Sequence, residues 1–463
     1  MSLLHDDTIA AISTPLGSAG IGKIRMSGPE AFEIAASLFK GVKGKNLKEV
    51  DTYTAHYGYV VEPDTGDIAD EVICIVMKGP HSFTGEDVVE FDCHGGTVPL
   101  KRVLEVLLDN GARLAEPGEF SKRAFLNGRL DLAQAEGIIE VINSKTNKGL
   151  DVALSHLGGQ LSKKIENIKG KVISLYAHLE AAIDFPEDEI EGFNSDEVRD
   201  RLEKIKKEIK ELLETSNQGK IYREGIRTVI VGKPNVGKSS LMNTLLEEKR
   251  AIVTDIPGTT RDIIEEYINI QGIPLRIIDT AGIRETDNMI EQIGVERARE
   301  SLTEADLILM MLDASQPLTE EDIRIYKMIE DKPVIIIVNK TDLREKINIE
   351  KAEKKFSKHK ILKMSLKEEE GLNDLKKAVI DEVLDEELRT GEGVFITRTR
   401  HKNALKNAYT ALERVSESHR RKMPYDFYTI DLKDCLNSLG EITGETVTDD
   451  IIDKIFHDFC LGK

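Results

Sequence analysis

A glycine-rich string near the middle of the chain combines the residue types that hold phosphate. Residues 232–239 read Gly-Lys-Pro-Asn-Val-Gly-Lys-Ser, which fits the spacing G-x-x-x-x-G-K-[ST]. In such a loop, backbone N–H groups approach the phosphates, Lys238 supplies positive charge to the β- and γ-oxygens, and Ser239 offers a hydroxyl to Mg²⁺. An apolar run precedes the string and a helical pattern follows it. This strand–loop–helix order predicts a nucleoside triphosphate site.

A second string selects the base. Asn339-Lys340-Thr341-Asp342 follows the apolar run 333–338, and ligands of open α/β sheets bind at the carboxyl ends of strands. The Asp342 carboxylate can accept hydrogen bonds from both N1–H and the 2-amino group of guanine. Adenine lacks this pair of donors, so the string predicts a preference for guanine.

Other strings complete the predicted site. Asp279-Thr280-Ala281-Gly282 ends another apolar run; Asp279 is expected to hold Mg²⁺ through water, and Gly282 to donate its N–H to the γ-phosphate. Thr260 is the expected threonine ligand of Mg²⁺. The candidate nucleotide-binding residues are Asn235, Val236, Gly237, Lys238, Ser239, Ser240, Thr254, Asp255, Ile256, Pro257, Gly258, Thr259, Thr260, Asp279, Thr280, Ala281, Gly282, Asn339, Lys340, Asp342, Ser365, Leu366 and Lys367.

The residues expected to catalyse GTP hydrolysis differ from those of many small GTPases. Many small GTPases place a glutamine after the Asp-x-x-Gly string to orient water, but this chain has Ile283, which cannot do so. Glu291, downstream, is the expected substitute, acting indirectly. No arginine finger is obvious. The Asn235 side-chain oxygen and carbonyls of residues 254–259 could instead bind a monovalent cation; the alternative is that Asn235 only caps the loop.

Composition limits the protein class. A chain of 463 residues is too long for one core, and its net charge of −19 requires that any nucleic-acid contact use a local basic patch. The four cysteines form no C-x-x-C pair, which argues against structural zinc and for a reducing, cytoplasmic location. No apolar run is long enough to predict a membrane span.

Periodicity predicts a multidomain chain with α/β and all-α parts. An α+β domain is expected first, then helices, a GTPase domain with a doubly wound, mostly parallel sheet, and helices again. The GTPase domain is therefore expected to be inserted into the helical one. One helix is predicted to start at Ser195 and end at Gly219. The predicted boundaries are 1–120, 121–218, 219–384 and 385–463.

Strings outside the GTPase domain add a family resemblance. They lie at residues 25–28, 82–87, 93–96, 117–120, 124–128, 130–136 and 182–186, and in the terminal Cys-Leu-Gly-Lys. On these strings the chain resembles the MnmE (TrmE) family of tRNA-modification GTPases over essentially its full length. The resemblance implies K⁺ in the GTPase site, with Asn235, Thr254, Ile256 and Thr259 as its ligands. It also implies that Ser239 and Thr260 bind Mg²⁺ and that Glu291 orients the attacking water.

The resemblance further implies a folate-binding, dimerising N-terminal domain. It would bind 5-formyl- or 5,10-methylene-tetrahydrofolate through Arg25, Glu90, Arg129 and Lys463. Glu90 suits the amino group and ring N–H of the pterin, and the cations suit the glutamate tail. Position 129 is lysine in some relatives. Arginine keeps the charge, but the geometry of its contact with the folate would differ. Cys460 is implied to have a chemical role in tRNA modification.

The implied reaction adds an aminomethyl or carboxymethylaminomethyl group to C5 of the wobble uridine of certain tRNAs. A homodimer would act with a flavoprotein, MnmG (GidA), in a hetero-oligomer in which only that partner holds FAD. A basic stretch, residues 398–422, could touch tRNA phosphates or could be a solvated helix face. Two rival readings are a GTP-gated assembly or signalling switch without modification chemistry, and an independent one-carbon transferase in the N-terminal domain.

Overall fold

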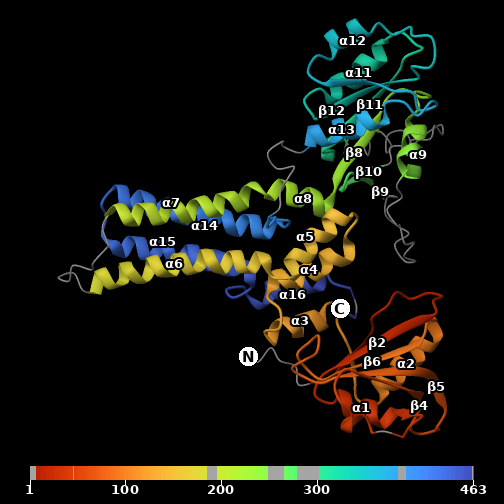
Figure 1. The fold of residues 1–463 in the computed structure, drawn as a ribbon, viewed down its shortest axis with the longest axis vertical. Helices are drawn as coiled ribbons and strands as arrows, with labels where there is room; N and C mark the ends of the chain where they lie inside the picture. The colour runs from red at the N-terminus through yellow and green to blue at the C-terminus, as the bar shows by residue number, and fades with distance from the viewer. Residues whose placement is uncertain are drawn as a thin grey trace, which may run out of the picture.

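The computed structural model describes residues 7–44, 46–184, 195–248, 265–278, 302–383, 393–460, 462 and 463. Figure 1 shows three parts: an N-terminal sheet domain in red and orange, a long helical bundle, and a second sheet domain in green and cyan. Among the described helices, none has both the length and the apolar run that crossing a membrane requires.

The N-terminal domain is built on a seven-stranded sheet in the order β3-β4-β5-β6-β2-β1-β7. Among these described strands, only β1 and β7 pair in parallel. Alternate strand residues, such as Ile24 and Phe91, are buried in one cluster with residues of α1 and α2. This confirms the predicted α+β class. The strands are β1 (Ile9–Ile12), β2 (Ile21–Ser27), β3 (Phe39–Gly41), β4 (Thr54–Val61), β5 (Ile68–Met77), β6 (Val88–His94) and β7 (Arg113–Leu114), and the helices are α1 (Ala31–Leu38), η1 (Leu47–Glu49) and α2 (Thr97–Asp109).

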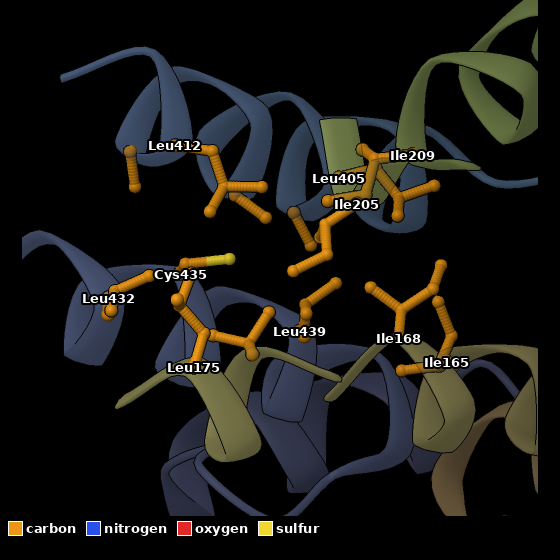
Figure 2. Packing of buried hydrophobic residues seen from close by; sticks show 14 of the residues in the cluster. Ile165, Ile168, Leu175, Ile205, Ile209, Leu405, Leu412, Leu432, Cys435 and Leu439 are labelled. Carbon is orange, nitrogen blue, oxygen red and sulfur yellow. The ribbon is translucent and has the colours of Figure 1, made fainter. Parts of the chain in front are cut away.

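The helical part is assembled from chain segments on both sides of the second sheet domain. Apolar residues at helical spacing on α6, α7, α14 and α15 form one buried cluster, which Figure 2 shows in close-up. The helices before the second sheet domain bury their apolar faces against the helices after it. Neither chain segment could therefore bury its apolar face alone. The helices are α3 (Glu119–Leu126), α4 (Leu132–Asn143), α5 (Asn147–Leu157), α6 (Gln160–Asp184), α7 (Ser195–Glu214), α8 (Ser216–Glu224), α14 (Thr399–Arg420), α15 (Tyr425–Thr443) and α16 (Asp449–His457).

The predicted helix begins at Ser195 as expected, but its predicted end at Gly219 is wrong. α7 ends at Glu214, and Gly219 lies inside the next helix, α8. The glycine is needed there for close approach rather than for ending a helix. A Cβ at position 219 would lie 2.4 Å from the carbonyl oxygen of Ile396, in the segment that returns from the second sheet domain.

In the described part of the second sheet domain, six strands pair in the order β13-β12-β11-β8-β10-β9. The pairs between these strands are parallel except the β9–β10 hairpin, so the sheet is mostly parallel, as predicted. Leu309 and Met310 on β11 belong to different buried clusters, so the sheet is covered on both faces, which confirms the doubly wound class. The strands are β8 (Ile226–Val231), β9 (Glu265–Ile270), β10 (Ile273–Ile278), β11 (Leu307–Asp313), β12 (Val334–Asn339) and β13 (Lys360–Lys363), and the helices are α9 (Lys238–Glu248), α11 (Glu320–Ile329), α12 (Ile349–Lys355) and α13 (Leu372–Val383).

A buried ion network fixes the segment that returns from this domain to the bundle. Arg398 Nε lies 2.9 Å from Glu140 Oε1, and Arg400 Nη2 lies 2.8 Å from Glu136 Oε2. Both glutamates belong to α4. The His156 ring bridges Glu140 and the carbonyl oxygen of Phe395, at 2.9 and 2.8 Å. Burial opposes ionisation of Glu140, but His156 and Arg398 outweigh it and lower its pKa to about 2. These contacts hold the segment that follows the second sheet domain, residues 395–400, against α4 and α5.

Candidate functional site

A pocket of about 780 Å³ lies where β8, β12 and β13 end. It brings together three of the predicted strings: the phosphate loop, the Asn-Lys-x-Asp string and the residues after β13. The lining residues are Asn235, Gly237, Lys238, Ser239, Ser240, Thr244, Asn339, Lys340, Asp342, Leu343, Leu366 and Lys367.

The phosphate loop has a backbone that requires glycine at position 237. Gly237 has φ of 109°, in the region that side chains rarely adopt. A Cβ there would lie 2.4 Å from Asn339 Nδ2, so the glycine also makes room for the next string. Lys238 begins α9 and donates from Nζ to the carbonyls of Gly232 and Lys233 at 2.7 and 2.8 Å. Burial lowers the pKa of Lys238, and the two carbonyl contacts hold its ammonium inside the loop.

The Asn-Lys-x-Asp string is joined to the phosphate loop by direct hydrogen bonds. Asn339 Nδ2 donates to the carbonyl oxygen of Val236 at 2.8 Å, and the backbone N–H of Leu366 donates to Asn339 Oδ1 at 3.3 Å. Lys340 Nζ donates to the carbonyl oxygen of Asn235 at 2.7 Å. Asn339 and Lys340 therefore hold three loops in one arrangement.

Asp342 is the exposed carboxylate of this string. Ser365 donates a hydrogen bond from its hydroxyl to Asp342 Oδ1 at 2.8 Å. Ser365 is itself buried and forms an isolated bridge with Glu370. The carboxylate is thus oriented by the loop after β13 while still lining the pocket.

Sequence reasoning missed Asp313 at the end of β11. Its carboxylate accepts from Lys340 Nζ at 2.6 Å and from the Ser315 hydroxyl at 2.6 Å. Burial opposes its ionisation, but these hydrogen bonds prevail and hold the pKa of Asp313 below the ordinary value. The sequence did contain a signal for Asp313. It ends a fully apolar strand, and the ends of such strands lie at the sheet edge where the phosphate loop and the Asn-Lys-x-Asp string also lie.

Several predicted residues lie outside the described part of the chain. They are Thr254, Asp255, Ile256, Pro257, Gly258, Thr259, Thr260, Asp279, Thr280, Ala281, Gly282 and Glu291.

A second cluster of charges lies on the face of the N-terminal sheet opposite α1 and α2. Arg25 on β2 and Glu90 on β6 are direct cross-strand partners, and their side chains are 2.8 Å apart. Lys23 Nζ also donates to Glu90, at 2.6 Å. Burial opposes ionisation of Glu90, but Arg25 and Lys23 hold its pKa below the ordinary value.

Two aromatic rings enclose the Arg25 guanidinium. Its carbon lies 5.0 Å from the Phe83 ring centroid and 5.7 Å from that of Phe120. Arg129 lies over the same Phe83 ring at 5.4 Å. Arg25 Nη1 is buried and has no hydrogen-bond acceptor among the described residues. A group with an acceptor oxygen would satisfy it. The sequence did not single out Phe83, Phe120 or Lys23 for this role.

The C-terminal tail reaches this cluster. Burial and the neighbouring charge of Arg25 lower the pKa of Lys463, while Glu90 opposes that effect. Cys460 is an exposed free thiol, and its carbonyl oxygen accepts the backbone N–H of Lys463 at 3.3 Å. The structure thus brings Arg25, Glu90, Arg129 and Lys463 to one region.

Comparisons with known proteins agree with this arrangement. The model for the MnmE helical domain matches residues 132–460, and the model for the GTP-binding protein TrmE N-terminus matches residues 8–129. The chain is 51% identical over 99% of its own length to tRNA modification GTPase MnmE of Alkaliphilus oremlandii and to that of Geobacillus thermodenitrificans, and covers 99% of each.

Among solved structures, Aquifex aeolicus Era bound to GDP·AlF4⁻ is 33% identical, covering 40% of this chain and 65% of that one. Its TM-score of 0.28 is too low to support an argument about fold. The relatives that are 51% identical over 99% of this chain show which family it belongs to. With a pocket that unites the phosphate-loop and guanine-selecting strings, they place this chain in the MnmE family of GTPases, which hydrolyse GTP in tRNA modification.

Proposed function

We propose that this GTPase is stimulated by K⁺ and acts with an FAD-dependent flavoprotein of the MnmG (GidA) type. The pair adds an aminomethyl or carboxymethylaminomethyl group to C5 of the wobble uridine of certain tRNAs, and a tetrahydrofolate supplies the carbon. The protein acts as a homodimer in the cytoplasm, where its tRNA substrate is found. The observation that carries the proposal is the pocket that gathers Lys238, Asn339 and Asp342 in a chain of this family.

The pocket residues have complementary roles in this proposal. Asp342 reads guanine, Lys238 neutralises the β- and γ-phosphates, and Ser239 binds Mg²⁺. Outside the described residues, Thr260 completes the Mg²⁺ ligands, Asp279 holds the ion through water, and Glu291 orients the attacking water. When bound, Mg²⁺ and K⁺ would supply charge neutralisation at the developing transition state.

Asn235 is the described residue that suits K⁺. It lines the pocket, and its carbonyl oxygen already accepts from Lys340. Its side-chain amide makes no hydrogen bond to any described residue, so the amide oxygen is available as a cation ligand. The proposed remaining ligands are Thr254, Ile256 and Thr259. Oxygen donors of this kind are the ones that a hard monovalent cation prefers.

The K⁺ proposal predicts a salt-specific rate. GTP hydrolysis in KCl should exceed that in NaCl at equal ionic strength by about tenfold or more. This factor corresponds to a barrier that charge neutralisation by K⁺ lowers by about 1.4 kcal/mol. Asn235→Ala should remove most of the difference, and Asn403→Ala, on an exposed position of α14, should preserve it. Equal slow rates of the wild type in both salts would refute the proposal and favour a switch that needs an external activator.

The folate proposal rests on the Arg25 cluster. The unsatisfied Arg25 Nη1 and the cations Arg129 and Lys463 suit the carboxylates of a glutamate tail. Glu90 keeps its proposed role toward the pterin, although both its oxygens already accept from Lys23 and Arg25. Each carboxylate oxygen has a second lone pair, so Glu90 can still accept hydrogen bonds from the pterin beside these two contacts. Cys460, exposed on the same tail, is proposed to serve the modification chemistry.

A further inference from the structure

An open groove of about 700 Å³ runs between α6 and α7, two helices of the bundle that contact each other. On α6 its residues recur at spacings of three and four, which puts them on one face of the helix. On α7 the same spacing produces a facing row. The lining residues are Gln160, Lys163, Lys164, Asn167, Lys171, Lys204, Lys207, Glu208, Glu211 and Val394.

The groove is positive in a strongly acidic protein. Its lining has five lysines and two glutamates, a net charge of +3, whereas the whole chain has −19. Lys171 pairs with Glu208 at 2.6 Å. Lys163, Lys164 and Lys204 make no ion pair or hydrogen bond with any residue that the structure describes. These three ammonium groups are therefore available to a ligand.

The basic stretch 398–422 differs in this respect. Arg398 and Arg400 are held by the buried carboxylates of α4. Arg414 pairs with Asp431 and Asp434, at 2.5 and 2.8 Å. The other arginines of the stretch, Arg420 and Arg421, both pair with Glu417. Much of the charge that the sequence shows there is thus neutralised within the protein.

We infer that the groove between α6 and α7 binds the phosphate backbone of the tRNA substrate. Lysines act as flexible point charges that suit phosphates without a fixed geometry, and the Gln160 and Asn167 amides add neutral donors. A protein partner fits less well, because protein interfaces are depleted in lysine and need buried aromatic or apolar anchors. Val394 is the single apolar side chain in the lining. The inference rests on tRNA being the substrate, as proposed above.

The test is a salt titration of tRNA binding. Wild type, a K163Q/K164Q/K204Q variant, and a control K351Q/K354Q/K355Q variant would be compared by fluorescence anisotropy with labelled tRNA. The control removes three exposed lysines from α12, in the other domain. Loss of three phosphate contacts should weaken binding at least about tenfold and reduce the slope of log K against log salt by about two to three. The control should bind as wild type does, and GTP hydrolysis without tRNA should be unchanged in both variants.

Each other outcome has a distinct meaning. If wild type binds tRNA and the groove variant binds it with the same affinity and salt slope, the groove assignment is wrong and the proposed function stands. If wild type binds no tRNA at any salt concentration, the tRNA part of the proposed function fails as well. If the groove variant loses binding to the flavoprotein but retains tRNA binding, the groove recognises an acidic protein surface and the inference is overturned.

Discussion

Replacing Asp342 by asparagine is expected to lower the affinity for GTP by about a hundredfold or more and to create affinity for XTP. The carboxylate accepts two N–H groups of guanine, whereas the asparagine amide would oppose its NH₂ to the guanine 2-amino group. An unsatisfied or opposed polar group costs about 1–3 kcal/mol, and two such contacts are affected. Xanthine has an oxygen in place of that amino group, so it can accept from the new amide.

Nucleotide exchange with fluorescent GTP and XTP analogues measures this change. Glu345→Gln is the matched control, because Glu345 is a nearby exposed carboxylate whose ion pair is with Lys363, at 3.1 Å. It should leave both affinities unchanged. A variant at Asp342 that keeps its preference for GTP would show that another group reads the base.

Removing Arg25 and Glu90 together is expected to weaken binding of 5-formyl-tetrahydrofolate by about a hundredfold, because two charge-assisted contacts of about 1.5–3 kcal/mol are lost. The double change Arg25→Ala, Glu90→Ala is preferable to either single change. A single change would leave one buried charge without its partner at 2.8 Å and destabilise the fold.

Isothermal titration with the folate gives the affinity. The control is Arg102→Ala, Glu62→Ala, which removes an exposed ion pair of 2.9 Å from the same domain. Thermal unfolding of both variants would show that the domain remains folded. Undiminished folate binding by the Arg25 and Glu90 variant would refute the site.

The nucleotide pocket was largely predictable because its chemistry is encoded in short, contiguous strings. A phosphate loop requires glycine at fixed positions, and the observed backbone at Gly237 shows why. The apolar strand that Asp313 ends marks its position, but its partner Lys340 could not be predicted, because that contact depends on the order of β11 and β12 in the sheet. Strand order is a property of the fold rather than of a local string.

The charged surfaces were harder to predict, since ion pairs join residues far apart in sequence. Arg398 and Glu140 are separated by more than two hundred positions, yet they form one buried pair. The lysines of α6 and α7 are separated in the sequence, and they line one groove only because the bundle places these helices side by side. The aromatic pair around Arg25 comes from a loop and from α3, which no periodicity connects.

The most direct test of the account is mass-spectrometric analysis of tRNA nucleosides from cells that lack this protein. Complementation would use the wild type and the Asp342→Asn variant. Deletion should remove the C5-aminomethyl-type wobble uridine, and the wild type alone should restore it. A nucleoside profile that does not change on deletion would contradict the assigned reaction.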